Sequence, residues 1–163
     1  MMPQVELRTA SAGDLDGLVE LAEQRRVDCE RFQPRFWRRA KDARIRQRQF
    51  FSSLLTDLDV LVVVVGDAAT IHGFAIARLV SSPPVYDPGG LTCLVDDFTV
   101  SSNAEWPERG LQLLEAVRSW GAERGAVQLV VVTAHLDAPK RETLTSAGLS
   151  IASEWWVGAI RRA

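Results

Sequence analysis

The sequence has few of the residues that build covalent cross-links and metal sites. Only two cysteines, Cys29 and Cys93, and two histidines occur among 163 residues, so we expect neither a disulfide framework nor a zinc site. No spacing of Ser, His and Asp typical of a catalytic triad is visible. Two isolated thiols suit a reducing cytoplasm, which is the location that we predict.

Long hydrophobic runs are also absent. No apolar run reaches the roughly 18 residues that a membrane helix needs, and the first residues, Met1-Met2-Pro3-Gln4, lack the basic and apolar regions of a secretory leader. No membrane partner is therefore expected. The composition, 47% hydrophobic and 25% charged, is ordinary for a globular protein. Without repeats or linkers, residues 1–163 are predicted to form a single domain.

Charge is distributed unevenly although the net charge is only −2. Residues 25–48 contain ten Lys or Arg and three acids, a local charge of +7 that leaves −9 for the rest of the chain. Such a segment could meet an acidic substrate or a nucleic acid. A helix with a solvated arginine face is the preferred interpretation. Nucleic acid is the weaker alternative because the pI is about 5.7 and we expect no interleaved aromatic residues on the arginine face of that helix.

Apolar periodicity predicts alternating strands and helices. Val5 to Thr9 alternates as a strand does, and Ser11 with Asp14 resembles a capping box before helical spacing of Leu15, Leu18, Val19 and Ala22. The other predicted helices are 34–58, 107–125 and 137–148. The other predicted strands are 60–65, 71–80, 91–100, 127–133 and 150–160.

Three patterns predict how these elements pack. The short polar link between 60–65 and 71–80 favours an antiparallel hairpin. The wholly apolar run 127–133 favours a strand covered on both faces, joined to 91–100 by a right-handed parallel crossover. In the helix 34–58 we expect one buried stripe, formed by Phe36, Ala40, Ala43, Phe50, Leu54 and Leu58.

The element order β-α-α-β-β-β-α-β-α-β resembles that of the GNAT superfamily of N-acetyltransferases and covers nearly the whole chain. Val95-Asp96-Asp97-Phe98-Thr99-Val100, followed by a loop and the helix with Leu113-Leu114, resembles the family's fourth strand and cofactor loop. Asp137 to Gly148 is similar to its Asn-to-Gly-Phe segment. The resemblance implies an α/β fold with a mixed sheet in which strands 4 and 5 splay apart.

The resemblance also implies a binding site for acetyl-CoA. Pantetheine would bond to the backbone of Phe98, Thr99 and Val100. The pyrophosphate would lie at the following helix start, the general anion site of a helix N-terminus. The residues assigned to the cofactor there are Arg109, Gly110 and Leu111, with Asp137 beyond the fifth strand. The sequence departs from the family pattern at Glu105 and Glu108 in the loop. It also has Leu144 where many members have a tyrosine that acts as general acid.

Acetyl transfer to an amine requires a group that accepts the amine proton, since a lysine-type amine titrates near ~10.4. A buried carboxylate can do this. Asp96 and Asp97 are the candidates, and as strand neighbours they should point to opposite faces. The resemblance favours Asp96, while the alternative is that one aspartate pairs with an arginine and the other meets solvent. Tyr86 could act as an acid over the site or merely line a pocket.

We therefore predict an N-acetyltransferase that moves an acetyl group from acetyl-CoA to a primary amine of a small molecule or peptide by direct transfer. The alternative is a catalytically impaired ligand-binding or interaction module with the same fold. Trp155 and Trp156 should point to opposite faces of the last strand, so that one fills the core and the other covers a substrate tunnel or a homodimer surface.

Overall fold

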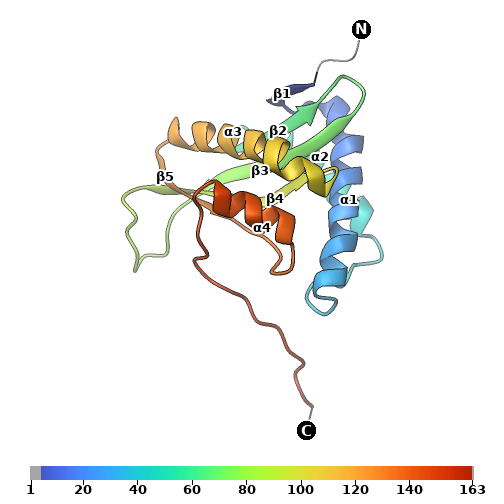
Figure 1. Ribbon diagram of the computed structural model, residues 1–163, viewed down its shortest axis with the longest axis vertical. Helices are drawn as coiled ribbons and strands as arrows, with labels where there is room; N and C mark the ends of the chain where they lie inside the picture. The colour runs from blue at the N-terminus through green and yellow to red at the C-terminus, as the bar shows by residue number, and fades with distance from the viewer. Residues whose placement is uncertain (1–4, 163) are drawn as a thin grey trace.

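The computed structural model describes residues 5–162 (Figure 1). Strands and helices alternate in the order that the sequence predicted, up to residue 148. The strands are β1 (Glu6–Thr9), β2 (Val60–Gly66), β3 (Ile71–Val80), β4 (Leu91–Val100) and β5 (Ala126–Val131). The helices are α1 (Leu15–Phe32), α2 (Ala43–Leu54), α3 (Leu111–Ala122) and α4 (Ala138–Ser146), with short turns η1 (Ala12–Asp14), η2 (Asn103–Glu105) and η3 (Trp106–Gly110).

The five strands form one sheet in sequence order. Neighbours from β1 to β4 are antiparallel, whereas β4 and β5 are parallel and are joined through α3. Both the hairpin and the parallel crossover are thus confirmed. Two β-branched runs joined by a short turn can pair directly as an antiparallel hairpin, whereas two parallel strands need a longer crossover connection, which here is α3.

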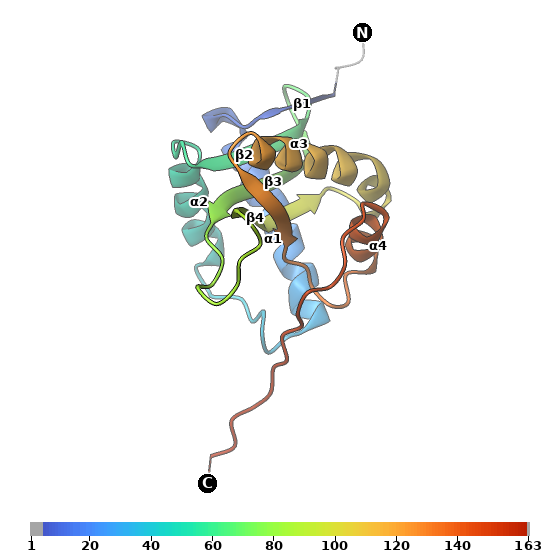
Figure 2. The same cartoon turned by 90° about the vertical axis from the view of Figure 1, so that its left-hand side faces the viewer.

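Helices cover both faces of the sheet, α1 and α2 on one side and α3 and α4 on the other (Figure 2). Leu18 and Val19 of α1 and Leu113, Leu114 and Val117 of α3 are buried to within 1%, as their helical spacing predicted. Ser11 donates its backbone N–H to the Asp14 carboxylate at 2.7 Å, which confirms the capping box.

The predicted helix 34–58 is wrong in its first part and in its buried face. Residues 33–42 form turns, and only Ala43–Leu54 is helical. Phe51 is buried to 1% exposure, whereas Phe50 is 45% and Leu58 94% exposed. The stripe is correct at Leu54, which packs against the core, and wrong at Phe50. Its ends, Phe36 and Leu58, lie outside α2.

The predicted last strand, 150–160, is not a strand. Residues 150–162 carry no regular structure, and all are exposed from residue 151 on; they run away from the sheet as an extended arm (Figures 1 and 2). The expectation that 127–133 is covered on both faces is also wrong. Val127, Val130 and Val132 stay 53%, 37% and 44% exposed, since the arm does not cover them. Within residues 5–162, no helix is long and apolar enough to cross a membrane.

Candidate active site

A β-bulge in β4 sets the direction of both candidate carboxylates. Ala77 pairs with Val95 and Ala75 with Phe98, so a single residue of β3, Ile76, faces two residues of β4. Those two residues are Asp96 and Asp97. A bulge of this kind inserts one extra residue and interrupts the alternation of side chains.

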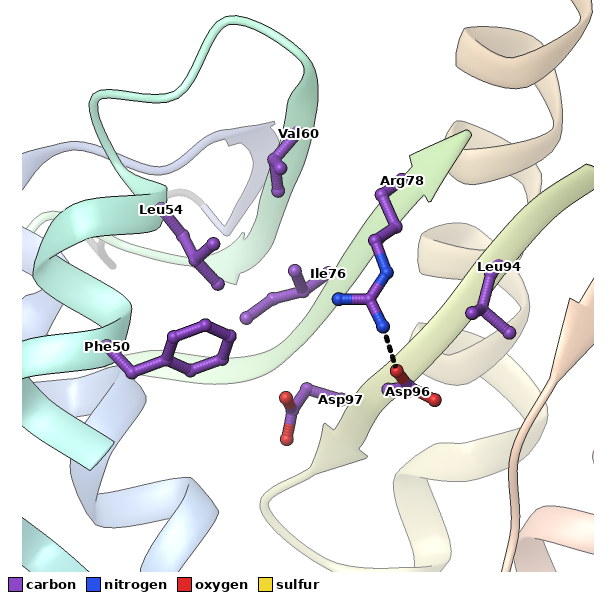
Figure 3. A pocket seen from close by; sticks show the side chains of 8 residues that line it. All are labelled: Phe50, Leu54, Val60, Ile76, Arg78, Leu94, Asp96 and Asp97. Atoms are coloured by element: carbon purple, nitrogen blue, oxygen red, sulfur yellow. Dashed lines mark hydrogen bonds and ion pairs between the residues drawn. The ribbon is translucent and has the colours of Figure 1, made fainter. Parts of the chain in front are cut away.

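Both aspartates consequently line the same hollow, on the side of the sheet that α2 covers (Figure 3). The prediction that they point to opposite faces is wrong, because it assumed an unbroken period of two. The hollow has a volume of about 210 Å³ and is otherwise lined by Phe50, Leu54, Val60, Ile76, Arg78 and Leu94. It therefore combines two acids and one arginine with apolar walls.

The two carboxylates differ in their environments. Asp96 accepts a hydrogen bond from the Arg78 guanidinium at 2.8 Å, and its side chain is 46% exposed. Asp97 lies deeper, at 23% exposure, and its nearest cation, Arg25, is 3.4 Å away. Burial raises the pKa of Asp97, an effect that Arg25 opposes and the neighbouring Asp96 reinforces. Asp97 is thus the more buried of the two carboxylates, although the family pattern pointed to Asp96.

The parallel pairing of β4 and β5 ends halfway along β4. Val95 is the last residue of β4 paired within β5, with Val131, and the Val132 N–H donates to the Val95 carbonyl at 2.9 Å. Beyond this point Phe98, Thr99 and Val100 pair only with β3. The predicted splay of the two strands is therefore confirmed.

The carbonyl of Phe98 faces this gap. The Ser101 N–H donates to the His72 carbonyl, and in an antiparallel pair the direction of the backbone groups alternates. By this alternation Thr99 bonds to β3, while Phe98 and Val100 direct their backbone groups toward the gap. This is the edge to which the sequence assigned the pantetheine of acetyl-CoA.

A lysine side chain crosses the gap. The Lys140 ammonium, in a residue that is only 1% exposed, donates to the Phe98 carbonyl at 2.9 Å and to the Val132 carbonyl at 3.2 Å. It also lies over the rings of Phe98 and Trp106, 5.2 and 5.6 Å from their centroids. Burial, with the charge of Arg25, lowers the pKa of Lys140 to about 7, and Asp137 opposes the shift.

Trp106 fills space beside the same gap. Its side chain is 3% exposed and meets the Phe98 ring edge to face, with centroids 5.0 Å apart. Gly110 packs directly against it, since a β-carbon at Gly110 would lie 2.6 Å from the indole. Gly110, which matches the glycine of the family's cofactor loop, therefore leaves the space that the Trp106 ring occupies.

The segment predicted to hold the pyrophosphate folds as η2 and η3. Arg109 is paired with Glu105, which also accepts a hydrogen bond from the Ser101 hydroxyl, and Pro107 has no N–H. The residues present therefore fit acetyl-CoA only in part. The edge of β4 is available once Lys140 moves, but this loop offers an anion neither a free arginine nor a full set of N–H donors.

The remaining predicted site residues lie apart from the carboxylates. Tyr86 is 72% exposed and lines a different hollow, with Pro83 and Gln128 among its neighbours. Asp137 caps α4 by accepting from the Lys140 N–H at 3.4 Å, as its position predicted. Leu111 begins α3. A role of these residues in binding the cofactor stays a prediction.

The basic segment is largely neutralised by neighbouring acids. Its ion pairs are Arg25–Asp97, Arg26–Glu23, Arg31–Asp28, Arg39 with Glu23 and Glu30, Arg44–Glu20, Arg46–Asp42 and Arg48–Asp16. Three of these acids, Asp16, Glu20 and Glu23, lie on α1 before the segment that was counted, and Asp97 lies on β4. A positive surface for an acidic partner is accordingly weaker than the local charge of +7 suggested.

Sequence reasoning missed Lys140 as a member of the site. One signal was available, since it is one of only two lysines and follows Asp-Ala-Pro at a helix start. That position predicts a solvent-facing cation. Its burial depends on how α4 packs over the end of β4, and no local pattern reveals this.

Several solved structures with the same fold are acetyltransferases by their stated function, and one, from Bacillus halodurans, is a transcriptional regulator, 17% identical with a TM-score of 0.71. A predicted acetyltransferase from Clostridium acetobutylicum, solved with acetyl-CoA, is 15% identical over 96% of both chains, with a TM-score of 0.73. The aminoglycoside N-acetyltransferase AAC(6')-Iy, solved with CoA, is 16% identical over 100% of this chain and 98% of its own, with a TM-score of 0.66. A mutant form of a Bacillus halodurans protein reaches 0.83 at 16% identity, covering 96% and 99%.

These likenesses define the fold: a mixed five-stranded sheet with parallel, splayed β4 and β5, as in the GNAT N-acetyltransferases. No protein-family model and no curated protein sequence matches the chain. The identities of 15–16% leave the chemistry to be argued from the site itself.

Proposed function

We propose that this protein is an N-acetyltransferase that uses acetyl-CoA as donor and a primary amine as acceptor, in a direct transfer. The observation that carries the proposal is the β4 bulge, which directs Asp96 and Asp97 into one hollow immediately before the edge where β4 parts from β5. A proton acceptor and a free strand edge on adjacent residues are what acyl transfer to an amine requires.

Asp97 is the proposed base. The amine nitrogen bonds to the acetyl carbonyl carbon, its proton goes to the Asp97 carboxylate directly or through a water, and the carbon–sulfur bond breaks with its electron pair on sulfur. A thiol titrates near ~8.5, so it can leave as thiolate without an acid. The exposed Tyr86 is not needed for this step. The Val100 N–H is the nearest backbone donor for the carbonyl oxygen.

The walls of the hollow favour an acceptor whose amine is carried on an apolar group. Phe50 and Leu54 from α2 supply the apolar contact, and the two carboxylates attract the ammonium form before it loses its proton. AAC(6')-Iy has been solved with a bisubstrate analogue that joins CoA to acetylneamine. A small-molecule amine is therefore the acceptor class that we propose to test first.

The test is thiol release from acetyl-CoA over a panel of amines, with Asp97→Asn and Asp96→Asn as a matched pair. Loss of a general base lowers turnover roughly 10²- to 10⁴-fold, which we expect for Asp97→Asn, while Asp96→Asn should stay within about tenfold. A wild-type protein that turns over no amine, or equal effects of the two substitutions, contradicts the assignment.

A second candidate function is favoured by Lys140 and Trp106, which occupy the gap. In this alternative the protein keeps the fold as a binding or interaction module without transfer. Titration calorimetry with acetyl-CoA separates the two, using Lys140→Ala and the exposed-lysine control Lys41→Ala. Binding by the wild type supports the transferase. Binding gained only in Lys140→Ala, or absent from all three, supports the module.

A further inference from the structure

The C-terminal arm, residues 150–162, exposes large apolar side chains along an extended backbone. Trp155 is 84% and Trp156 90% exposed, and Ile151 and Ile160 are 65% and 92% exposed. Together these leave a hydrophobic surface that a protein alone in water rarely presents. β-Branched and aromatic residues of this kind are enriched in strands that pack on a sheet. The arm has the composition of a strand but lacks a partner.

A partner of the right type is present elsewhere in the fold. β5 is the last strand of the sheet, and within residues 5–162 no strand pairs with its outer edge. On the face turned away from α3, Val130 and Val132 remain partly exposed. An uncovered edge strand carries a row of backbone N–H and C=O groups that can pair with another chain.

The arm does not run back along its own β5. After Gly148, which ends α4 with a positive φ of 85°, the Leu149 N–H bonds to the Leu144 carbonyl and the chain leaves the body. Trp155 then lies edge to face with Phe36 in the turn after α1, with centroids 6.1 Å apart. Both views show the arm extending beyond the molecule (Figures 1 and 2).

We propose that the arm pairs with the outer edge of β5 of a second copy, so that two chains exchange their C-terminal strands in a symmetric dimer. Each copy then gives one strand and receives one, which satisfies both arms and both open edges. Because adjacent residues of a strand point to opposite faces, one of the two tryptophans covers Val130 and Val132. The other packs on the side of α3 and α4.

The length of the arm suits this exchange. β5 has six residues, Ala126–Val131, and the arm has ten residues from Ile151 to Ile160 that are extended and exposed. Glu154, Arg161 and Arg162 are its only charged residues before the C-terminal alanine, so the paired segment carries little charge into the interface. This proposal does not depend on the enzymatic activity.

Size-exclusion chromatography with light scattering tests the stoichiometry. The wild type should have twice the chain mass of 18.0 kDa, and Trp156→Ala should raise the dimer dissociation constant at least about tenfold, as loss of a tryptophan anchor does. Leu58→Ala, which removes an apolar side chain that is 94% exposed just before β2 and far from β5 in the sheet, should leave it unchanged. A wild type that stays monomeric at ~1 mM overturns the proposal.

Disulfide trapping tests whether the strand is exchanged. One chain carries Val130→Cys, and a second, differently tagged chain carries Ser153→Cys, Glu154→Cys or Val157→Cys, because directly opposite residues of paired strands lie within disulfide range. Oxidation of the mixed, co-refolded chains should link the two tags for at least one arm position. A disulfide that forms only inside a single chain carrying both cysteines, with no link between tags, overturns the exchange.

Discussion

The Lys140 ammonium and the Phe98 carbonyl are joined by a 2.9 Å hydrogen bond across the gap between β4 and β5. Without this bond the carbonyl would face a buried space unpaired, at a cost of about 1–3 kcal/mol. A side chain thus satisfies a backbone group that a neighbouring strand would satisfy in a continuous sheet. Together with its bond to the Val132 carbonyl, the Lys140 ammonium thus bridges the gap between β4 and the residue that follows β5.

Lys140 should make the stability of the protein increase with pH. Its folded pKa of about 7 lies below the ordinary 10.5, so between these values the unfolded chain binds more protons than the folded one. The free energy of unfolding therefore rises between about pH 7 and 10.5, by at most about 1.4 kcal/mol per pH unit. Urea denaturation over this range measures it. Lys140→Met should remove the slope, and the exposed Lys41→Met should retain it.

The Asp97 carboxylate should lower the free energy of unfolding at neutral pH. Because the folded pKa of Asp97 is raised above 3.8, the protonated side chain stabilises the folded protein at low pH, and this stabilisation is lost as the pH rises through the folded pKa. Asp97→Asn should accordingly become more stable relative to the wild type between pH 4 and 7, while its turnover falls. Thermal unfolding at both pH values is the measurement. An equal gain in Asp96→Asn would show that the effect is not specific to the deeper carboxylate.

Gly110 should tolerate a side chain only when Trp106 is reduced in size. The β-carbon of Gly110→Ala would lie 2.6 Å from the indole, and overpacking of this kind costs about 1–3 kcal/mol. In a Trp106→Leu background the same substitution should cost clearly less. A double-mutant cycle by urea denaturation gives the coupling. No coupling between the two positions would mean that Gly110 is present for another reason, such as close approach of a ligand.

Asp14 should protect the protein against acid. The Arg8 guanidinium donates to its carboxylate at 2.7 and 2.8 Å and lowers the pKa of Asp14 to about 2. This stability is present above the ordinary 3.8 and is lost as the pH falls through 2. Asp14→Asn should lose on the order of 2 kcal/mol at pH 7 and little at pH 2. The control is Asp16, whose side chain is 85% exposed in its ion pair with Arg48. Asp16→Asn should change the free energy of unfolding by less than about 1 kcal/mol.

Several elements could be predicted because their determinants are local. β2 and β3 are apolar runs closed by Gly66 and Asp67, and both formed as an antiparallel hairpin. Leu113, Leu114 and Val117 repeat at helical spacing and are buried. A strand order and a crossover follow once such elements are recognised, since short connections and handedness leave few topologies. The sequence therefore determined the order of the elements and the strand pairing up to residue 148, but not the turns of residues 33–42.

The site depended on tertiary structure. The β4 bulge that turns Asp97 to the same side as Asp96 arises from register with β3, which no period within β4 reveals. Lys140 is buried because α4 packs over the splayed end of β4. The last strand does not form because the chain leaves the body after Gly148 and pairs with no strand of residues 5–162, although the outer edge of β5 is open, and propensity alone does not decide where a segment pairs. Residue types determined which elements form, and only their packing decided which charges are buried and which edges stay open.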